Sequence, residues 1–273
     1  MSTLTADSLL PLEAAPGVTP PRVAKAEWIK FRSLRSTWYS LGAVMLVAIG
    51  LGVLFADLRG NDVANHGGFA SGVDWTQVSL RGTFLAQLAV GVLGVLMITG
   101  EYTTGMIRAS LSAVPSRGLV LAAKVAVLGV ATFVVATITS LIAFTLGQAM
   151  LSSHHYGVSL SSPGALRAVI GGGLFLALVA LLGLGCGFAI RSTGGALATL
   201  FGLLLVLPLL AQALPNSWQN DIDKYLPFQA GSAVLSTVSR PDSLGPWAGI
   251  GVLAVYVAVT LSIGFVLLRR RDA

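Results

Sequence analysis

The chain has 273 residues, of which 55% are hydrophobic and only 10% are Asp, Glu, Lys or Arg. Soluble domains are about a quarter charged, so this composition excludes an ordinary water-soluble protein. A mean hydropathy of +0.82 and 32 glycines point the same way, because glycine is more frequent in membrane helices than in soluble ones.

The first residues differ from the rest of the chain. Residues 1–21 hold four of the 11 prolines together with Asp7 and Glu13, and they contain no basic residue. This pattern predicts a disordered lead-in rather than a signal peptide, which would need a basic start and an apolar run. We therefore expect a lead-in over 1–21 and a single membrane domain over 22–273.

The residue pattern of segment 22–37 predicts an amphipathic helix. On a helical wheel, Val23 and Phe31 cluster on the face opposite basic residues, as in helices that lie in the headgroup region of a membrane. Glu27 falls on the apolar side, where an unpaired carboxylate is costly. We therefore expect Glu27 to pair with Lys30 or with a residue from another loop.

Six stretches further along contain no Asp, Glu, Lys, Arg or His. A helix of about 20 apolar residues crosses the ~30 Å core of a bilayer, and each stretch is close to that length. The sequence therefore predicts an all-α polytopic membrane protein with six transmembrane helices. The stretches are 38–56, 83–100, 125–150, 168–190, 194–214 and 247–268.

The distribution of basic residues predicts the orientation of these helices. If the spans alternate in direction, twelve of the 17 basic residues fall on one side, together with both termini. Basic residues concentrate on the cytoplasmic side of membrane proteins, so we expect both termini in the cytoplasm. The net charge of +6 is then a topology signal, and we expect no nucleic-acid partner. The five basic residues on the other side are Arg59, Arg81, Arg167, Lys224 and Arg240.

Two connecting segments have patterns of their own. In 101–116, apolar residues such as Met106 and Ile107 recur at helical spacing up to Pro115, which predicts a short cytoplasmic helix between spans two and three. The alternative for this segment is a plain surface loop. The segment 215–246 is too apolar for a free outer loop, and Pro227 should separate two short helices within it.

Nothing in the sequence supports catalysis or a cofactor. His66, His154 and His155 all fall in predicted outer loops, and two adjacent histidines without a strong third ligand do not predict a metal site. The phosphate-binding pattern G-x-x-x-x-G-K-[ST] is absent from the sequence, as is the metalloprotease pattern H-E-x-x-H. We therefore expect neither an enzyme nor a nucleotide site in this chain.

The polar residues at membrane depth are uncharged. An ion-driven carrier usually keeps ionisable residues there, so the charge-free stretches make that class less favoured without excluding it. Most neutral polar residues in spans hydrogen-bond between helices. Some could instead line a path for an amphipathic substrate, and the candidates are Gln87, Thr99, Gln148 and Gln212.

Three segments in order resemble one known family. AEWIKFRSLRST (26–37) looks like an interfacial helix before span one, and GEYTTGMIRASLSAVPSRG (100–118) looks like the segment after span two that contains a coupling helix. YLPFQAGSAV (225–234) is similar to the outer re-entrant region before the last span. Together they resemble the ATP-binding-cassette (ABC) type-2 permeases, in particular the actinobacterial ones. The outer loop 57–82 matches no part of that family that we can assign.

The resemblance implies a permease subunit without its own ATPase. It would pair with a second permease copy, identical or not, and with two copies of a separate ATPase subunit that binds ATP and Mg²⁺. Segments 22–37 and 100–116 would rest on that ATPase. By position, we expect the coupling contacts to be Glu27, Glu101, Tyr102 and Arg108, and we expect Glu101→Lys to uncouple transport without loss of membrane insertion.

The expected function is therefore ATP-driven export across the cytoplasmic membrane. The charge-free spans favour an amphipathic or hydrophobic cargo such as a drug, natural product, peptide or lipid. Two other functions stay open at this point. One is an ion-coupled secondary carrier, and the other is a non-transporting membrane sensor or immunity subunit.

Overall fold

The computed structural model describes residues 19–66, 72–114, 116–213, 215–238 and 243–271, and every regular element within these ranges is helical. Within them, six helices are long and apolar enough to cross a membrane, and each charge-free stretch overlaps one of them. The predicted all-α polytopic membrane fold is confirmed. The six helices span Arg35–Asn65, Thr83–Thr103, Arg117–Ser153, Ala165–Ile190, Thr193–Ala211 and Pro246–Arg270.

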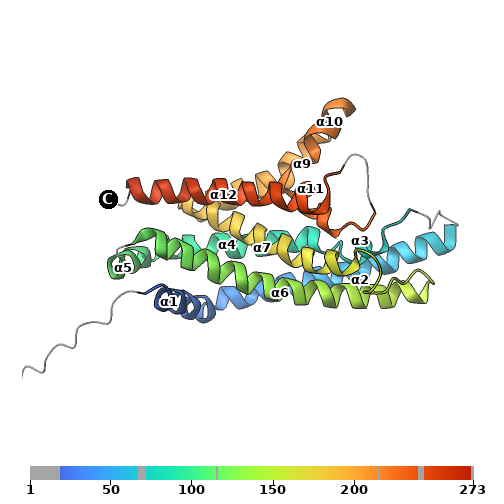
Figure 1. Ribbon diagram of the computed structural model, residues 1–273, viewed down its shortest axis with the longest axis horizontal. Helices are drawn as coiled ribbons and strands as arrows, with labels where there is room; N and C mark the ends of the chain where they lie inside the picture. The colour runs from blue at the N-terminus through green and yellow to red at the C-terminus, as the bar shows by residue number, and fades with distance from the viewer. Residues whose placement is uncertain (1–18, 67–71, 115, 214, 239–242, 272–273) are drawn as a thin grey trace, which may run out of the picture.

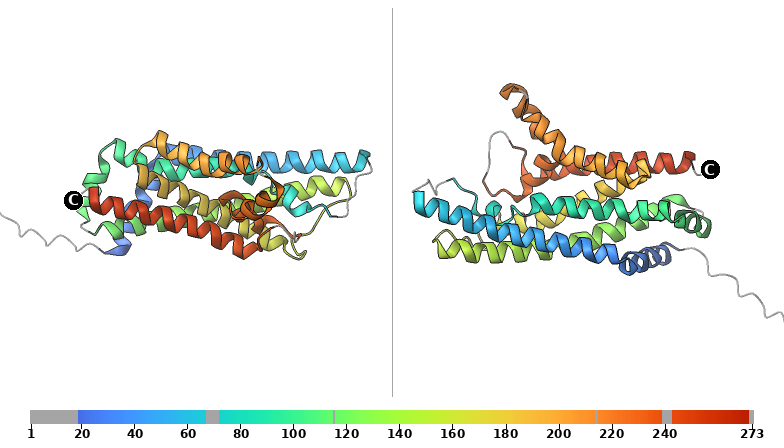
Figure 2. Two further views of the ribbon diagram at one scale, coloured as in Figure 1. Left: turned by 90° about the horizontal axis from the view of Figure 1, so that it is seen from above. Right: turned by 180° about the vertical axis from the view of Figure 1, so that it is seen from behind.

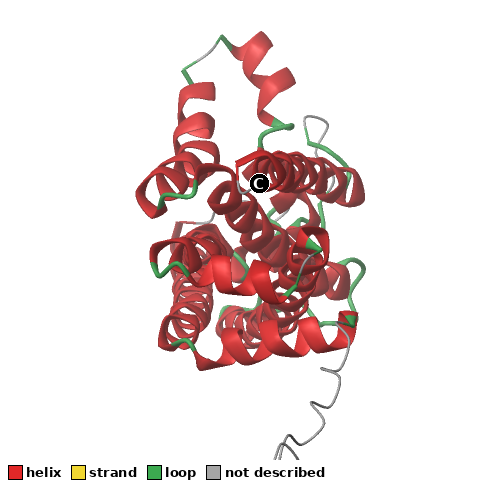
Figure 3. Cartoon of the chain, turned by 90° about the vertical axis from the view of Figure 1, so that its left-hand side faces the viewer, coloured by secondary structure: helices red, strands yellow, loops and turns green. Residues whose placement is uncertain are grey.

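The long helices run side by side and form an elongated bundle (Figure 1). One end, called here the α5 end, carries α1, α5 and the C-terminal end of α12; the opposite end, called the α3 end, carries α3, α10 and α11. Figure 3 looks at the bundle from the α5 end. The elements are α1 (Pro20–Ser33), α2 (Arg35–His66), α3 (Trp75–Ser79), α4 (Thr83–Thr103), α5 (Met106–Ala113), α6 (Arg117–Ser153), α7 (Ala165–Ile190), α8 (Thr193–Phe201), η2 (Gly202–Val206), α9 (Leu207–Ala211), α10 (Asn216–Asp223), α11 (Pro227–Ser232), η3 (Ala233–Leu235) and α12 (Pro246–Arg271).

Helix α1 lies across the bundle axis at the α5 end (Figures 1 and 2). Prolines occupy its first two positions, where the missing N–H groups need no partner. We expected one helix through Thr37, but α1 ends at Ser33 and Leu34 has an extended backbone. The corner is held by the Trp38 indole N–H, which donates to the Arg32 carbonyl at 3.0 Å and so satisfies an otherwise free helix-end acceptor.

A second corner separates α4 from α5. Gly105 adopts the left-handed conformation with φ of 70°, which glycine reaches without steric cost and which commonly ends a helix. The short helix predicted within 101–116 is therefore present as Met106–Ala113, but it begins later than 101. Glu101 belongs instead to the last turn of the membrane-spanning helix α4.

Helix α7 occupies the centre of the bundle and packs against α4, α6 and α12. Small residues make this possible, because they let helix backbones approach closely in a membrane. A Cβ atom at Gly94 of α4 would overlap the Ala180 carbonyl oxygen of α7, and one at Gly183 would overlap the Gly91 carbonyl oxygen. These two contacts, Gly94 with Ala180 and Gly183 with Gly91, hold the backbones of α4 and α7 close together. We call this line of contact the seam between α4 and α7.

The fifth span is not a regular α-helix. Residues 202–206 form a π-helical turn, and the Leu207 N–H donates to the Gly202 carbonyl five residues earlier. Pro208 explains the irregularity, since it has no N–H to donate and its ring clashes with the carbonyl four residues before it. The distortion at this proline thus takes the form of a wide turn ahead of it.

At the α3 end, the segment 215–246 does contain two short helices, α10 and α11, and Pro227 is the first residue of the second. Helix α10 stands away from the bundle (Figure 2), whereas α11 and η3 pack on α7 and α12. The buried carboxylate of Asp74 joins the start of α3 to residues 236–238, called here the η3 loop because they follow η3. It accepts hydrogen bonds from the Thr237 N–H (2.6 Å), the Thr237 hydroxyl (2.9 Å) and the Ser236 hydroxyl (2.9 Å).

Candidate functional site

Four charged side chains from three helices meet at the α5 end. Helix α1 supplies Glu27 and Lys30, one turn apart; α4 supplies Glu101 from its last turn; and α6 supplies Lys124 from its second turn. We call these four residues the buried charge cluster. Their formal charges cancel, so the cluster is neutral as a whole.

Each lysine of the buried charge cluster contacts both glutamates. The Lys124 ammonium donates to Glu27 Oε2 at 2.6 Å and to Glu101 Oε1 at 2.8 Å. The Lys30 ammonium donates to Glu27 Oε1 at 2.8 Å and to Glu101 Oε1 at 3.2 Å. Lys30 also donates to the Ser110 hydroxyl at 2.8 Å, which connects the cluster to α5. Four helices are thereby joined through one polar centre.

Burial makes these contacts consequential. The Lys124 side chain is 1% exposed and the Glu27 side chain is 3% exposed. Charges removed from water are stable only when they are paired and hydrogen-bonded, and removing one partner leaves an uncompensated buried charge. Removal of either lysine should therefore weaken the docking of helix α1 on the bundle.

The two residues of α1 have shifted pKa values. Burial acts to raise the pKa of Glu27, but the Lys124 and Lys30 ammonium groups outweigh it, and the pKa lies below its usual value of 4.5. Burial acts to lower the pKa of Lys30, but the Glu27 and Glu101 carboxylates outweigh it, and the pKa lies above its usual value of 10.5. Both residues are therefore charged at neutral pH.

The structure places the four predicted coupling residues in three different environments. Glu27 and Glu101 belong to the buried charge cluster. The ring of Tyr102 lies 5.1 Å below the Arg191 guanidinium, at the junction between α7 and α8. Arg108 is exposed on α5, so of the four it is the best placed to contact another protein.

Because Glu101 is buried, the substitution Glu101→Lys tests more than a contact with an ATPase. A lysine there would put a third ammonium group beside Lys30 and Lys124 and would disrupt the cluster itself. A loss of transport in that variant would then report on the packing of the α5 end and on coupling together. An exposed residue of α5 is a cleaner probe of contact with a partner.

Of the four candidate substrate-path residues, Gln87 and Thr99 lie on α4, Gln148 lies on α6 and Gln212 directly follows α9, and no hydrogen bond joins any two of them in the described part of the chain. Gln87 is fully buried in α4, and its amide has no hydrogen-bond partner within the described residues. Thr99 donates to the Val95 carbonyl of its own helix at 3.1 Å. Gln212 is exposed at the end of α9.

The side-chain amide of Gln148 instead makes hydrogen bonds that hold neighbouring segments together. Its amide nitrogen donates to the Trp75 carbonyl at 3.0 Å and to the Ser79 hydroxyl at 2.9 Å, and its amide oxygen accepts from the Val158 N–H at 2.7 Å. The side chain thus fastens α3 and the 158 loop to α6. Its hydrogen-bonding groups are occupied by these contacts.

The sequence interpretation had no role for Lys124 beyond topology. The available signal was its position, directly before the charge-free stretch 125–150. A lysine at the start of a span can extend to the headgroups, which is the common arrangement. Here it points into the bundle, because Glu27 and Glu101 converge there.

The sequence matches the family described as "ABC-2 family transporter protein" over residues 23–208, from α1 to α9. The chain belongs to the ABC-2 transporter family. No curated protein sequence matches it. Membership makes this ABC-2 chain a multi-pass permease component of an ABC transporter, in a family whose members work with an ATPase partner.

Proposed function

We propose that this ABC-2 chain is the membrane subunit of an ATP-driven exporter in the cytoplasmic membrane, with both termini in the cytoplasm. Two copies of a separate ATPase subunit bind ATP and Mg²⁺, and a second permease copy completes the transport path. The cargo is an amphipathic or hydrophobic molecule. Family membership supports the ATPase partner in general terms, and the basic residues of the α5 end support its cytoplasmic location.

The buried charge cluster is the observation that carries this proposal. It joins α1, α4 and α6 directly and reaches α5 through the Lys30–Ser110 hydrogen bond. A force applied to α5 is therefore transmitted to two spans at once, because these helices share one polar centre that is costly to break. Such a rigid connection is what a permease needs to turn closure of an ATPase into helix motion.

Helix α5 presents the surface that an ATPase would contact. Ile107 is buried against the bundle, whereas Met106 and Arg108 are exposed at the tip of the α5 end. In the proposed cycle, binding of ATP closes the two ATPase subunits and displaces α5. The displacement moves α4 and α6 together and opens the path toward the α3 end.

The first experiment is purification of the tagged full-length chain from its native membrane. We expect a separately encoded ATPase with a G-x-x-x-x-G-K-[ST] motif to co-purify, and we expect its ATP hydrolysis to respond to amphipathic candidate cargo. An ion-coupled carrier, a sensor or an immunity subunit needs neither result. Absence of the ATPase under conditions that keep the chain folded would contradict the proposal.

A charge reversal on α5 sharpens this experiment. We expect Arg108→Glu to weaken association with the ATPase by about tenfold or more, since a charge reversed at an interface meets like charge. The matched control is Arg269→Glu, which reverses an exposed arginine of α12 at the same end. Equal ATPase retention by the two variants would reject the role of Arg108.

A further inference from the structure

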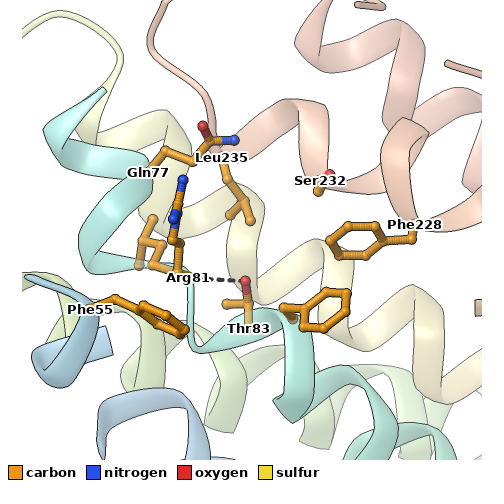
Figure 4. A pocket seen from close by; sticks show the side chains of 9 residues that line it. Phe55, Gln77, Arg81, Thr83, Phe228, Ser232 and Leu235 are labelled. Carbon is orange, nitrogen blue, oxygen red and sulfur yellow. Dashed lines mark hydrogen bonds between the residues drawn. The ribbon is translucent and has the colours of Figure 1, made fainter. Parts of the chain in front are cut away.

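A cavity of about 380 Å³ opens at the α3 end, far from the buried charge cluster (Figure 4). Its walls come from α2, α3, the α3–α4 turn, the start of α4, α11 and η3. The volume is in the range of small-ligand sites, which are about 300–1,000 Å³. The coupling proposed at the α5 end does not involve this cavity.

One wall of the cavity is aromatic. Phe84 of α4 meets Phe228 of α11 edge to face, with ring centroids 5.0 Å apart. Phe228 in turn meets the buried Phe175 of α7 at 6.2 Å, which anchors it to the centre of the bundle. Phe55 of α2 lies across the opening (Figure 4) and is 37% exposed, as Phe84 is 43% exposed. These faces suit an apolar chain or ring system.

The polar side of the cavity is cationic. Of the nine lining residues drawn in Figure 4, Arg81 alone carries a charge, and Gln77 lies beside it. Within the described part of the chain, the Arg81 guanidinium has no side-chain partner. A second cavity of about 390 Å³ also borders Arg81 and Gln77.

Neighbouring charges at the α3 end are committed elsewhere. Arg59 pairs with Asp62 at 2.6 Å, and the Asp74 carboxylate accepts hydrogen bonds from residues of the η3 loop and from the Gln77 N–H. Arg81 therefore has five donors at the edge of an apolar chamber. Guanidinium groups bind phosphate and carboxylate through paired hydrogen bonds.

We propose that this cavity binds an anionic amphiphile, with its phosphate, sulfate or carboxylate group on Arg81 and its apolar part against Phe84 and Phe228. Two sources can supply such a molecule. One is a bilayer lipid that seals or regulates this end of the permease, and the other is a transported molecule on its way across. Both share the chemistry that the cavity recognises.

The test uses the full-length chain in phosphatidylcholine nanodiscs and two photoreactive probes: a diazirine-bearing fatty acid and the matching fatty alcohol. Labelled peptides are identified by mass spectrometry. We expect the acid to label the segments around Phe84 and Phe228 about tenfold more than the alcohol, which is the ratio expected of one hydrogen-bonded charge pair. Equal labelling by acid and alcohol would reject the proposal.

Two variants and one control test which residues bind the fatty-acid probe. Arg81→Gln should reduce labelling by the acid about tenfold, to the level of the alcohol. Arg59→Gln changes another arginine at the same end, one that is paired and does not line this cavity, and labelling should stay unchanged. Ser232→Leu fills the cavity and should suppress both probes. Undiminished labelling in Arg81→Gln or Ser232→Leu that elutes like the native chain would overturn the proposal.

The source is decided by adding phosphatidylglycerol to the nanodiscs. Suppression of fatty-acid labelling identifies a bilayer lipid as the occupant, and persistence identifies a separate amphiphile. Binding is measured without the ATPase, so a negative result would leave the permease proposal intact. Conversely, failure of an ATPase to co-purify would leave this site standing.

Discussion

At the residue scale, Lys124 is the side chain on which the α5 end depends most. It contacts both carboxylates of the buried charge cluster and is almost completely removed from solvent. Without it, Glu27 and Glu101 would face each other with only the half-buried Lys30 between them. A buried pair of this kind contributes little net stability compared with an apolar core, but removing one member is expensive.

We therefore predict that Lys124→Met destabilises the folded chain by about 3–5 kcal/mol, because the substitution leaves buried carboxylates uncompensated. The measurement is the midpoint of thermal unfolding in mild detergent. Lys25→Met is the control: Lys25 is exposed on α1, and a change there should be worth less than about 0.5 kcal/mol. Equal midpoints for the two variants would show that the cluster does not hold α1 in place.

Asp74 gives a prediction at the α3 end that depends on pH. Burial acts to raise its pKa, but hydrogen bonds from the N–H groups of Gln77 and Thr237 and from nearby hydroxyls outweigh it, and the pKa lies below 3.8. A depressed folded-state pKa adds stability that is present above 3.8 and is lost as the pH falls through the folded value.

Asp74→Asn should therefore lower stability at neutral pH by about 2–3 kcal/mol, since hydrogen bonds to a charged acceptor are lost. The difference from the native chain should shrink at a pH below 3.8. Thermal unfolding of both proteins at the two pH values measures this. A difference that stays constant with pH would mean that the Asp74 charge contributes nothing.

At the element scale, the seam between α4 and α7 depends on glycines, which have no side chain to keep the two backbones apart. Backbone atoms of the two helices come so close at Gly94 that a Cβ there would overlap the Ala180 carbonyl. Both partners at this contact are backbone, so neither can move aside without separating the helices. Close approach of this kind replaces the hydrophobic effect as the source of helix association within a membrane.

Gly94→Ala should consequently push α4 from α7 and destabilise the bundle by about 1–3 kcal/mol, the usual range for overpacking. Gly100→Ala on the same helix is the matched control, because a Cβ at Gly100 meets nothing within 4 Å. Alanine there should be neutral or stabilising by up to about 1 kcal/mol through helix propensity. A comparison of thermal midpoints distinguishes packing from propensity, and equal shifts would count against the seam.

At the scale of the whole molecule, the orientation proposed from the basic residues can be measured with cysteines. Cys186, the single native cysteine, is buried in α7 at 3% exposure and should react slowly. Ser112 on α5 and Ser159 in the loop before α7 are both exposed and lie at opposite ends of the bundle.

In intact cells, a membrane-impermeant maleimide should label Ser159→Cys and should label Ser112→Cys only after permeabilisation. This result is expected because the basic residues of the α5 end are proposed to lie in the cytoplasm. The native chain serves as the background control. Labelling of Ser112→Cys in sealed cells would reverse the orientation, and with it the proposed site of the ATPase.

The sequence by itself determined the fold class, the six spans and the family resemblance. These properties depend on local quantities: the length of charge-free stretches against the thickness of a bilayer, and the order of three short segments. It also indicated that Glu27 needed a partner, since a carboxylate on an apolar helical face is costly wherever it lies.

Only the tertiary structure decided how those pieces meet. Glu27 and Lys124 are 97 residues apart, and no periodicity joins them, so their pairing appears only once α1 crosses the bundle. The same holds for Gln148, whose hydrogen bonds depend on where α3 docks, and for Arg81, which borders a cavity formed by helices distant in sequence. The amino-acid sequence determines which charged and polar side chains are removed from water. The packing of the helices determines which partners compensate their charges and hydrogen-bonding groups.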